Sequence, residues 1–428
     1  MEFLRYLVYK TTGKTLLIKD RATITLIKDT TFKNVENLFA TYESDYGLKH
    51  LAGIFYRFKP IFLAFRAAAH MKPVINRIRR LAENYHSPMP EDYLNEITAK
   101  VERNEPLLEA DLKEELNTVN PFRKIRLAYA LKYRTKDADS ILYRIRNGKS
   151  YAKSFDFQNK QYASDVLDIV LESITDDLRE NVEGKRIFIP ENIEYSLPTT
   201  EKQFTGMFPS GTSVKIPTDM VFGVYWENVG KNRIDLDLSL INLDAKYGWD
   251  GVYRNKDRSI LFSGDMTDAK DGASELFYIQ RQEANSFLFC LNYFNYDPNI
   301  EVPFKLFVAH ESIKNMKQNY MVDPNNIVAQ AGSTVRQRQL VLGVVVVNDE
   351  ESTFYFAETS IGNSISARGV KYVDDGLKYL KNYYTNTINL RSLLESAGAI
   401  LSDQESCNLD LSPEKLEKDT IINLLVKK

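Results

Sequence analysis

The stretch from Arg233 to Asn242 places two carboxylates at the spacing of a β-strand. Apolar residues alternate here with Asp235 and Asp237, so a strand would bury the apolar side chains and project both carboxylates from its other face, about 7 Å apart. Like charges on one face of a strand repel each other. A hard cation with oxygen ligands is the simplest compensation for that repulsion.

A second acidic segment follows, with the sequence FSGDMTDAKDGASE. Its glycines would let backbone carbonyls and carboxylates fold around one ion, and its donor set is rich in oxygen and free of sulfur and histidine. Such a set suits calcium better than a transition metal. The spacing of an EF-hand is absent. The alternative interpretation is a polar hairpin loop, which also uses Asp and Gly.

Taken together, RIDLDLSLINLD and ILFSGDMTDAKDGASE resemble the TerD-like domains of the tellurite-resistance stress-protein family over about residues 185–360. In that family a D-x-D-x-S strand is followed by an aromatic, S/H, G, D, x, T loop that closes on an acidic residue. The resemblance implies a calcium-binding β-sandwich and a bacterial stress-response role. It implies Ca2+ ligands at Asp235, Asp237, Asp265 and Glu275, and less directly at Thr267 and Asp271. Gly272-Ala273-Ser274 stands where the family usually has further acids.

Basic and aromatic side chains interleave between residues 122 and 153. Such side chains neutralise phosphates and stack bases, which predicts binding of RNA, single-stranded DNA or another acidic partner. The alternative is structural, because Arg and Lys stems often cover apolar helix faces. The candidate nucleic-acid-binding residues are Arg123, Lys124, Arg126, Arg134, Arg144, Arg146 and Lys149.

The opening RYLVYKTTGKTLLIKD and the later segment INRIRRLAENYHSPMP show a weaker resemblance to the TROVE module of Ro-type RNA-binding proteins, over about residues 3–150. The metal-binding domain that normally follows that module is not evident. The string Asp235-x-Asp237-x-Ser239 has Asp where that domain's D-x-S-x-S loop needs Ser. The tellurite-resistance assignment is therefore preferred for the second half.

Length and composition predict two globular units. The chain has 428 residues, of which 43% are hydrophobic, and two distant cysteines that rule out a disulfide framework. The net charge of −2 hides an asymmetry, because residues 1–155 carry an excess of Lys and Arg and residues 156–428 an excess of Asp and Glu. No secretion signal or membrane-spanning run is recognised, so we expect a cytoplasmic protein without a membrane partner.

Periodicity predicts an α+β fold. Helical spacing from about Phe32 to Lys132 predicts a stack of short helices, and alternation around Asn147-Gly148 predicts a β-hairpin over Ile141–Lys153. A further hairpin is predicted from Leu4–Tyr9 and Thr15–Lys19. The expected domains are a basic, mainly helical module (1–158), a linking helix (159–184), an acidic TerD-like β-sandwich (185–385) and a helical tail (386–428).

Short runs rich in β-branched and aromatic residues predict the sandwich strands. The expected strands are Met220–Trp226, Arg233–Asn242, Ser259–Phe262, Phe287–Tyr293, Pro303–Ala309, Gln339–Val347 and Thr353–Ala357. Helical period returns over Tyr372–Tyr384, and a terminal amphipathic helix is expected within Ser412–Lys428.

Motifs of established catalytic sites are lacking. The four histidines fall at no metal-ligand spacing, and neither a phosphate loop nor a nucleophile elbow is present. The sequence therefore favours a non-enzymatic, calcium-binding stress-response protein whose basic module binds RNA. The alternative is a metal-dependent nucleic-acid-processing enzyme whose catalytic acids are the same aspartates.

Overall fold

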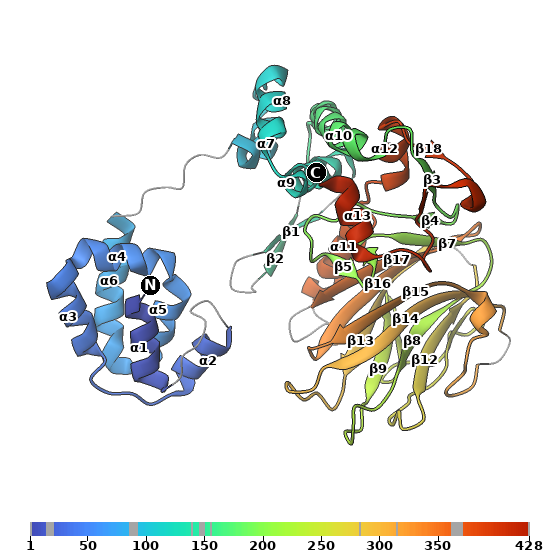
Figure 1. The fold of residues 1–428 in the computed structure, drawn as a ribbon. Coiled ribbons are helices and arrows are strands. Elements are labelled where there is room, and N and C mark those ends of the chain that lie inside the picture. The colour runs from blue at the N-terminus through green and yellow to red at the C-terminus, as the bar shows by residue number, and fades with distance from the viewer. Residues whose placement is uncertain are drawn as a thin grey trace. The chain divides into compact units, whose positions relative to one another are not determined.

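A computed structural model describes most of the chain and divides it into two compact units, Met1–Asp92 and Tyr93–Lys428. Figure 1 shows helices in the first unit and both helices and sheets in the second, so the α+β class is confirmed. The described residues are 2–13, 21–84, 93–137, 140–144, 150–154, 156–281, 284–313, 316–360 and 371–426.

The first unit is a helical bundle around a core of its own. Its core is rich in Phe, Leu and Ile, including Phe39, Phe62 and Phe65. In its described residues it comprises α1 (Glu2–Thr12), α2 (Arg21–Asp29), α3 (Glu36–Tyr46), α4 (Leu48–Arg57), α5 (Lys59–Phe65), a short 3-10 turn η1 (Ala69–Met71) and α6 (Lys72–Asn84).

The predicted N-terminal hairpin is wrong, because Leu4–Tyr9 lies inside helix α1. Leu4, Leu7 and Val8 recur at helical spacing and are all buried. The other predicted strand, Thr15–Lys19, falls outside the described residues. The stack of short helices expected further along the chain is confirmed.

The helices of the second unit come from segments before and after the sandwich strands in the sequence. They are α7 (Tyr93–Glu102), α8 (Glu109–Thr118), α9 (Pro121–Thr135), α10 (Lys160–Val182), α11 (Lys371–Tyr384), α12 (Leu390–Ser396) and α13 (Lys418–Leu425). Helix α9 starts at Pro121, and the Asn120 side chain caps it by accepting a hydrogen bond from the Phe122 N–H.

The predicted domain boundary at residue 158 lies inside this second unit. The reason is packing: α10 lies against α9, α12 and α13, and the Asn181 Nδ2 donates to the carbonyls of Leu424 and Val426. Charge distribution and periodicity carry no information on such contacts. The strands of the Ile141–Lys153 hairpin are confirmed as β1 (Ser140–Arg144) and β2 (Ser150–Ser154), and its Asn147-Gly148 turn is outside the described residues.

Two antiparallel sheets form the β-sandwich (Figure 1). One has the order β10 (Lys246–Gly248), β9 (Leu236–Ile241), β13 (Asn285–Tyr293), β16 (Gln339–Val347), β17 (Ser352–Ser360), β7 (Ser213–Ile216), β4 (Ile193–Glu194). The other has the order β11 (Ile260–Phe262), β12 (Ala273–Ile279), β8 (Met220–Trp226), β14 (Val302–His310), β15 (Ile327–Val335).

Aromatic side chains from both sheets form the sandwich core. Phe222 on β8 meets Phe289 on β13 edge to face at 5.1 Å between ring centroids, and Phe354 on β17 at 5.5 Å. The outer face of the seven-stranded sheet is covered by residues of α9 and α11, among them Tyr133 and Tyr379. A separate buried cluster, with Val221 and Leu276, lies on the five-stranded sheet, so both sheets have an outer face that is partly buried.

Small sheets complete the second unit. The strands β18 (Ile400–Leu401) and β19 (Leu409–Asp410) lie parallel to β3 (Arg186–Phe188), and β5 (Phe204–Thr205) pairs with β6 (Phe208–Pro209). Two further 3-10 turns are η2 (Pro324–Asn326) and η3 (Gln404–Ser406). Among the described helices, none combines the length and the apolarity needed to span a bilayer.

Candidate metal centre

Asp235 and Asp237 lie at the start of β9, on the face of the strand that does not enter the sandwich core. Their neighbours Ile234, Leu236 and Leu238 are fully buried in that core. The alternation predicted from the sequence therefore determines where both carboxylates point. Both aspartates are themselves almost completely buried, at 3% and 2% exposure.

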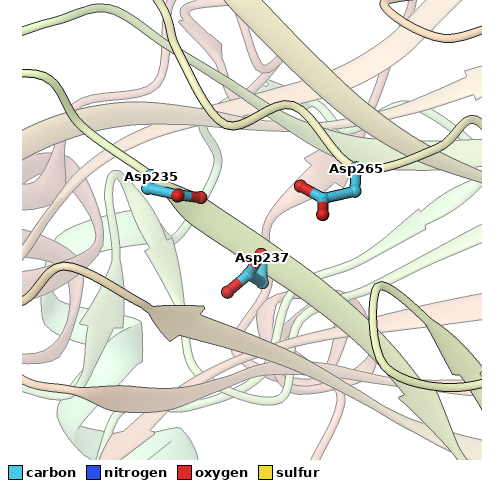
Figure 2. A group of neighbouring side chains, drawn as sticks. All are labelled: Asp235, Asp237 and Asp265. Atoms are coloured by element: carbon cyan, nitrogen blue, oxygen red, sulfur yellow. The ribbon is translucent and has the colours of Figure 1, made fainter.

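Asp265 reaches the same place from the loop between β11 and β12. Gly264, just before it, has a φ of 106°, a conformation that favours glycine. One oxygen from each of Asp235, Asp237 and Asp265 lies within 4.8 Å of the others. Figure 2 shows the three carboxylates turned toward a shared space between strand and loop. Together they are called the Asp cluster below.

Several atoms of the Asp cluster lack the partners that buried oxygens normally have. The Oδ1 atoms of Asp235 and Asp265 are buried and accept no hydrogen bond from any described residue. The Oδ2 of Asp237 accepts one from the Asn292 Nδ2 at 3.1 Å. A buried carboxylate oxygen left unpaired is costly, so these atoms are suited to a ligand that is positively charged.

One positive side chain lies beside the cluster. The Arg233 Nη2 donates to the Asp235 Oδ2 at 3.2 Å, and its Nε donates to the Thr267 carbonyl. The arginine side chain is 57% exposed, whereas that of Asp235 is 4% exposed. One partly solvated cation faces three carboxylates, so the cluster keeps an excess of negative charge.

The pKa values of all three cluster carboxyls are raised, chiefly by burial. Burial, then the charges of Asp235, Asp265 and Asp250, raises the pKa of Asp237 to about 7, although the Asn292 hydrogen bond opposes the rise. Burial also raises the pKa of Asp235 and of Asp265 above the ordinary range. Without a counterion, the cluster therefore retains protons at pH values at which exposed aspartates are ionised.

Glu275 lies on β12 and is fully buried next to the Asp cluster. Its Oε2 accepts a hydrogen bond from the Leu238 N–H and its Oε1 one from the Met266 N–H, both at 2.8 Å. Burial is the main cause that raises the pKa of Glu275 well above its usual value. Because the two donors flank Asp237 and Asp265, the carboxylate of Glu275 fixes the backbone on both sides of the cluster.

The remaining predicted ligands are Thr267 and Asp271, and Asp271 is not among the carboxylates that lie within 4.8 Å of one another. Thr267 and Asp271 are exposed in the same loop, and the carbonyl of Thr267 is engaged by Arg233. Of the six predicted ligands, the structure brings together Asp235, Asp237 and Asp265. Glu275 lies beside them, and its side-chain oxygens accept hydrogen bonds from backbone N–H groups.

Three residues that support the site were missed. Asn292 is opposite Asp237 in the pairing of β13 with β9, and the Asn295 Oδ1 accepts from the Asp235 N–H. The Gln318 Nε2 donates to the Asp265 carbonyl. In the sequence CLNYFNYD the two asparagines stand among aromatic residues, but only the strand register shows which aspartate Asn292 meets.

The Asp cluster offers carboxylate oxygens as metal ligands, and such oxygens suit hard cations such as Ca2+ and Mg2+. Ca2+ tolerates irregular geometry and six to eight ligands, whereas Mg2+ requires nearly octahedral geometry. Three carboxylates from a strand and a loop would leave several coordination positions to water or to a bound molecule.

Four of the candidate nucleic-acid-binding residues lie on helix α9. Lys124 is 1% exposed and forms an ion pair with Asp177 at 2.5 Å, so it belongs to the packing of α9 against α10. The Arg126 Nη1 donates to the Thr199 carbonyl, and the Arg134 Nη1 donates to the Ala130 carbonyl. Arg123 is half-buried on the same helix.

The other three candidate residues belong to the segment from Arg144 to Lys149. Arg144 belongs to β1, with a side chain outside the description, and Arg146 and Lys149 lie outside the described residues. Binding of nucleic acid by this set of residues stays a prediction.

Comparisons with known proteins identify no family. No family model and no curated protein matches the chain. One solved structure that does match is described as the crystal structure of the unknown-function protein SAV2460, with 16% sequence identity and a TM-score of 0.26, over 34% of this chain and 91% of that one. At this TM-score the likeness carries no argument about fold or function. The resemblances to the TerD-like and TROVE families stay predictions from the sequence.

Proposed function

We propose that the chain is a divalent-cation-binding protein and that the Asp cluster binds calcium. The observation that carries this proposal is the combination of proximity and missing partners. Three carboxylate oxygens lie within 4.8 Å of one another, and the Oδ1 of the almost completely buried Asp235 accepts no hydrogen bond from any described residue. A bound divalent ion would neutralise the charge excess and provide that oxygen with a partner.

Calcium is proposed over magnesium because the ligands come from a strand and a loop in an irregular arrangement. Ca2+ tolerates irregular coordination, whereas Mg2+ requires nearly octahedral geometry. The TerD-like resemblance implies the same ion and a stress-response role in the cytoplasm. That role, and an RNA partner for basic residues of the chain, form part of the proposal and rest on the sequence alone.

Calorimetry on the purified chain tests the proposal. When calcium is titrated into the wild type at pH 8, the heat of binding should saturate. The same titration of Asp235→Asn should give no heat of binding. Asp271→Asn is the matched control, because Asp271 is an exposed acid of the same loop that lies outside the cluster. Equal heats in wild type and Asp235→Asn would remove the Asp cluster from the claim.

The enzyme alternative predicts a different result from the same preparation. A metal-dependent nuclease would cleave RNA or single-stranded DNA with Mg2+ or Mn2+ and lose turnover in Asp237→Asn. Binding of calcium without turnover under those conditions would favour the non-enzymatic function.

A further inference from the structure

A second site lies on helices α9 and α11 and is independent of the Asp cluster. It is a pocket of about 340 Å³ within the second unit, a volume within the usual range for small-molecule sites. Its walls come from α9, from the end of α11 and from three connecting segments. The lining residues used below are Arg126, Tyr129, Tyr133, Arg134, Tyr379, Tyr383, Tyr384 and Asn386.

The pocket is unusually rich in tyrosine. Five tyrosines line it, and two of them on α11, Tyr379 and Tyr383, have nearly parallel rings 5.7 Å apart at an angle of 29°. Tyr133 on α9 approaches Tyr379 at 6.2 Å. Grouped aromatic rings present flat, polarizable faces, which suit a planar aromatic ligand.

The charged residues of the lining are both arginines. Arg126 and Arg134 line the pocket, and no Asp or Glu occurs among the lining residues that the structure describes. The Arg126 Nη1 donates to the Thr199 carbonyl at 3.2 Å, which holds the exposed guanidinium against the pocket wall. A guanidinium has five N–H donors, so Arg126 has donors for an anion as well as for that carbonyl.

A buried acceptor completes the lining. Asn386 is 4% exposed, and its Nδ2 donates to the Tyr129 carbonyl at 3.2 Å. Its Oδ1 is buried and accepts no hydrogen bond from any described residue. An unpaired buried acceptor in a pocket favours a ligand with an N–H donor.

We propose that this pocket binds a nucleoside 5′-phosphate, either free or at the 5′ end of a single strand. The base stacks on the tyrosine rings, an amino or imino N–H of the base donates to the Asn386 Oδ1, and the phosphate accepts from Arg126. A planar ring, an N–H donor and an anionic group in one molecule satisfy all three features of the lining.

Calorimetry with AMP on the full chain tests the proposal, in EDTA so that the result does not depend on the Asp cluster. AMP should bind the wild type, and Arg126→Ala should weaken binding about tenfold or more, because a hydrogen bond to a charged group is lost. Lys378→Ala is the matched control, since it removes an exposed positive charge from α11 outside the pocket and should leave affinity unchanged. Tyr383→Ala should also weaken binding about tenfold.

A 5′-phosphorylated oligoadenylate of eight nucleotides distinguishes the two sources of the ligand. Stronger binding of the oligonucleotide than of AMP would indicate a strand end, and equal binding would indicate a free nucleotide. Circular dichroism should show that the variants are folded. If Tyr383→Ala is unfolded, the result is taken from Arg126→Ala, because Arg126 is exposed. The proposal is overturned if neither compound binds, or if Arg126→Ala binds as tightly as wild type.

Discussion

Asp177 and the Asp cluster, both in the second unit, differ in the cations that lie beside their carboxylates. Asp177 on α10 is paired with Lys124 of α9 at 2.5 Å, with both side chains almost completely buried. The Asp cluster at β9 has three carboxylates and the mostly exposed Arg233 beside one of them. The helical region thus contains its own buried cation, whereas the described residues of the sandwich place only the mostly exposed Arg233 beside the Asp cluster.

This contrast separates a charge that is part of the packing from charges that form a site. Burying a carboxylate without a partner costs free energy, so buried carboxylates that serve only packing are normally paired with a cation. Unpaired buried charge is therefore a reason to look for a ligand. The predictions below test the contrast in order of decreasing expected effect.

The largest effect is expected from Lys124→Met. Removing the lysine leaves Asp177 buried without its cation, which should lower the free energy of unfolding by about 3–5 kcal/mol in urea denaturation. Lys113→Met is the control, because Lys113 pairs with Glu109 and Glu172 at the surface, where solvent screens the pair, so this substitution should lower the free energy of unfolding far less. Equal losses in the two variants would mean that burial does not distinguish the pairs.

A somewhat smaller effect is expected when calcium is added to or removed from the wild type. At 100 times the dissociation constant, calcium should stabilise the folded chain by about 2.7 kcal/mol, and EDTA should reverse it. Asp237→Asn should show no such gain in thermal unfolding. A calcium response that survives this substitution would place the ion elsewhere.

Glu275→Gln distinguishes a ligand from a residue that positions ligands. Because both oxygens of Glu275 accept backbone N–H groups, the substitution should weaken calcium binding by about 10–100-fold without abolishing it. Calorimetry beside Asp235→Asn measures the difference. Complete loss in both variants would indicate that Glu275 binds the ion directly.

The last effect is on the stability of the metal-free protein and depends on pH. The pKa of Asp237 is raised to about 7, so the folded state holds this proton more tightly than the unfolded state, whose pKa is about 3.9. Stability from this group is present below about pH 4 and is lost as the pH rises to about 7.

In EDTA at pH 8, Asp237→Asn should therefore be more stable than wild type, and its stability should change less between pH 4 and 7. Urea denaturation across this pH range measures both. A wild type that gains stability relative to the variant as pH rises would contradict the raised pKa.

The α+β class and much of the sandwich could be predicted from local pattern. The bounds of Met220–Trp226 and Gln339–Val347 agree with the observed strands, because β-branched and aromatic runs are flanked by turn residues. Strand β12 was missed: all seven of its residues are buried, so it shows no alternation, and Asp and Gly residues precede it.

Periodicity predicted the candidate site only where one strand determines geometry, and Asp265 and Glu275 entered the prediction through the TerD-like resemblance. Alternation along β9 places Asp235 and Asp237 on one face, but the position of Asp265 depends on a loop and that of Asn292 on strand register. Lys124 shows the same limit in the basic segment, because its sequence neighbours do not reveal the partner Asp177 on another helix. Contacts between distant segments decide which charges are buried, paired or left for a ligand.

The most direct test of the metal centre is a crystal structure of the chain grown with excess calcium, with anomalous differences measured. The account predicts one peak between the carboxylates of Asp235, Asp237 and Asp265, with oxygen atoms about 2.3–2.6 Å from the ion. Well-ordered carboxylates with water alone between them, or a peak elsewhere in the chain, would contradict it.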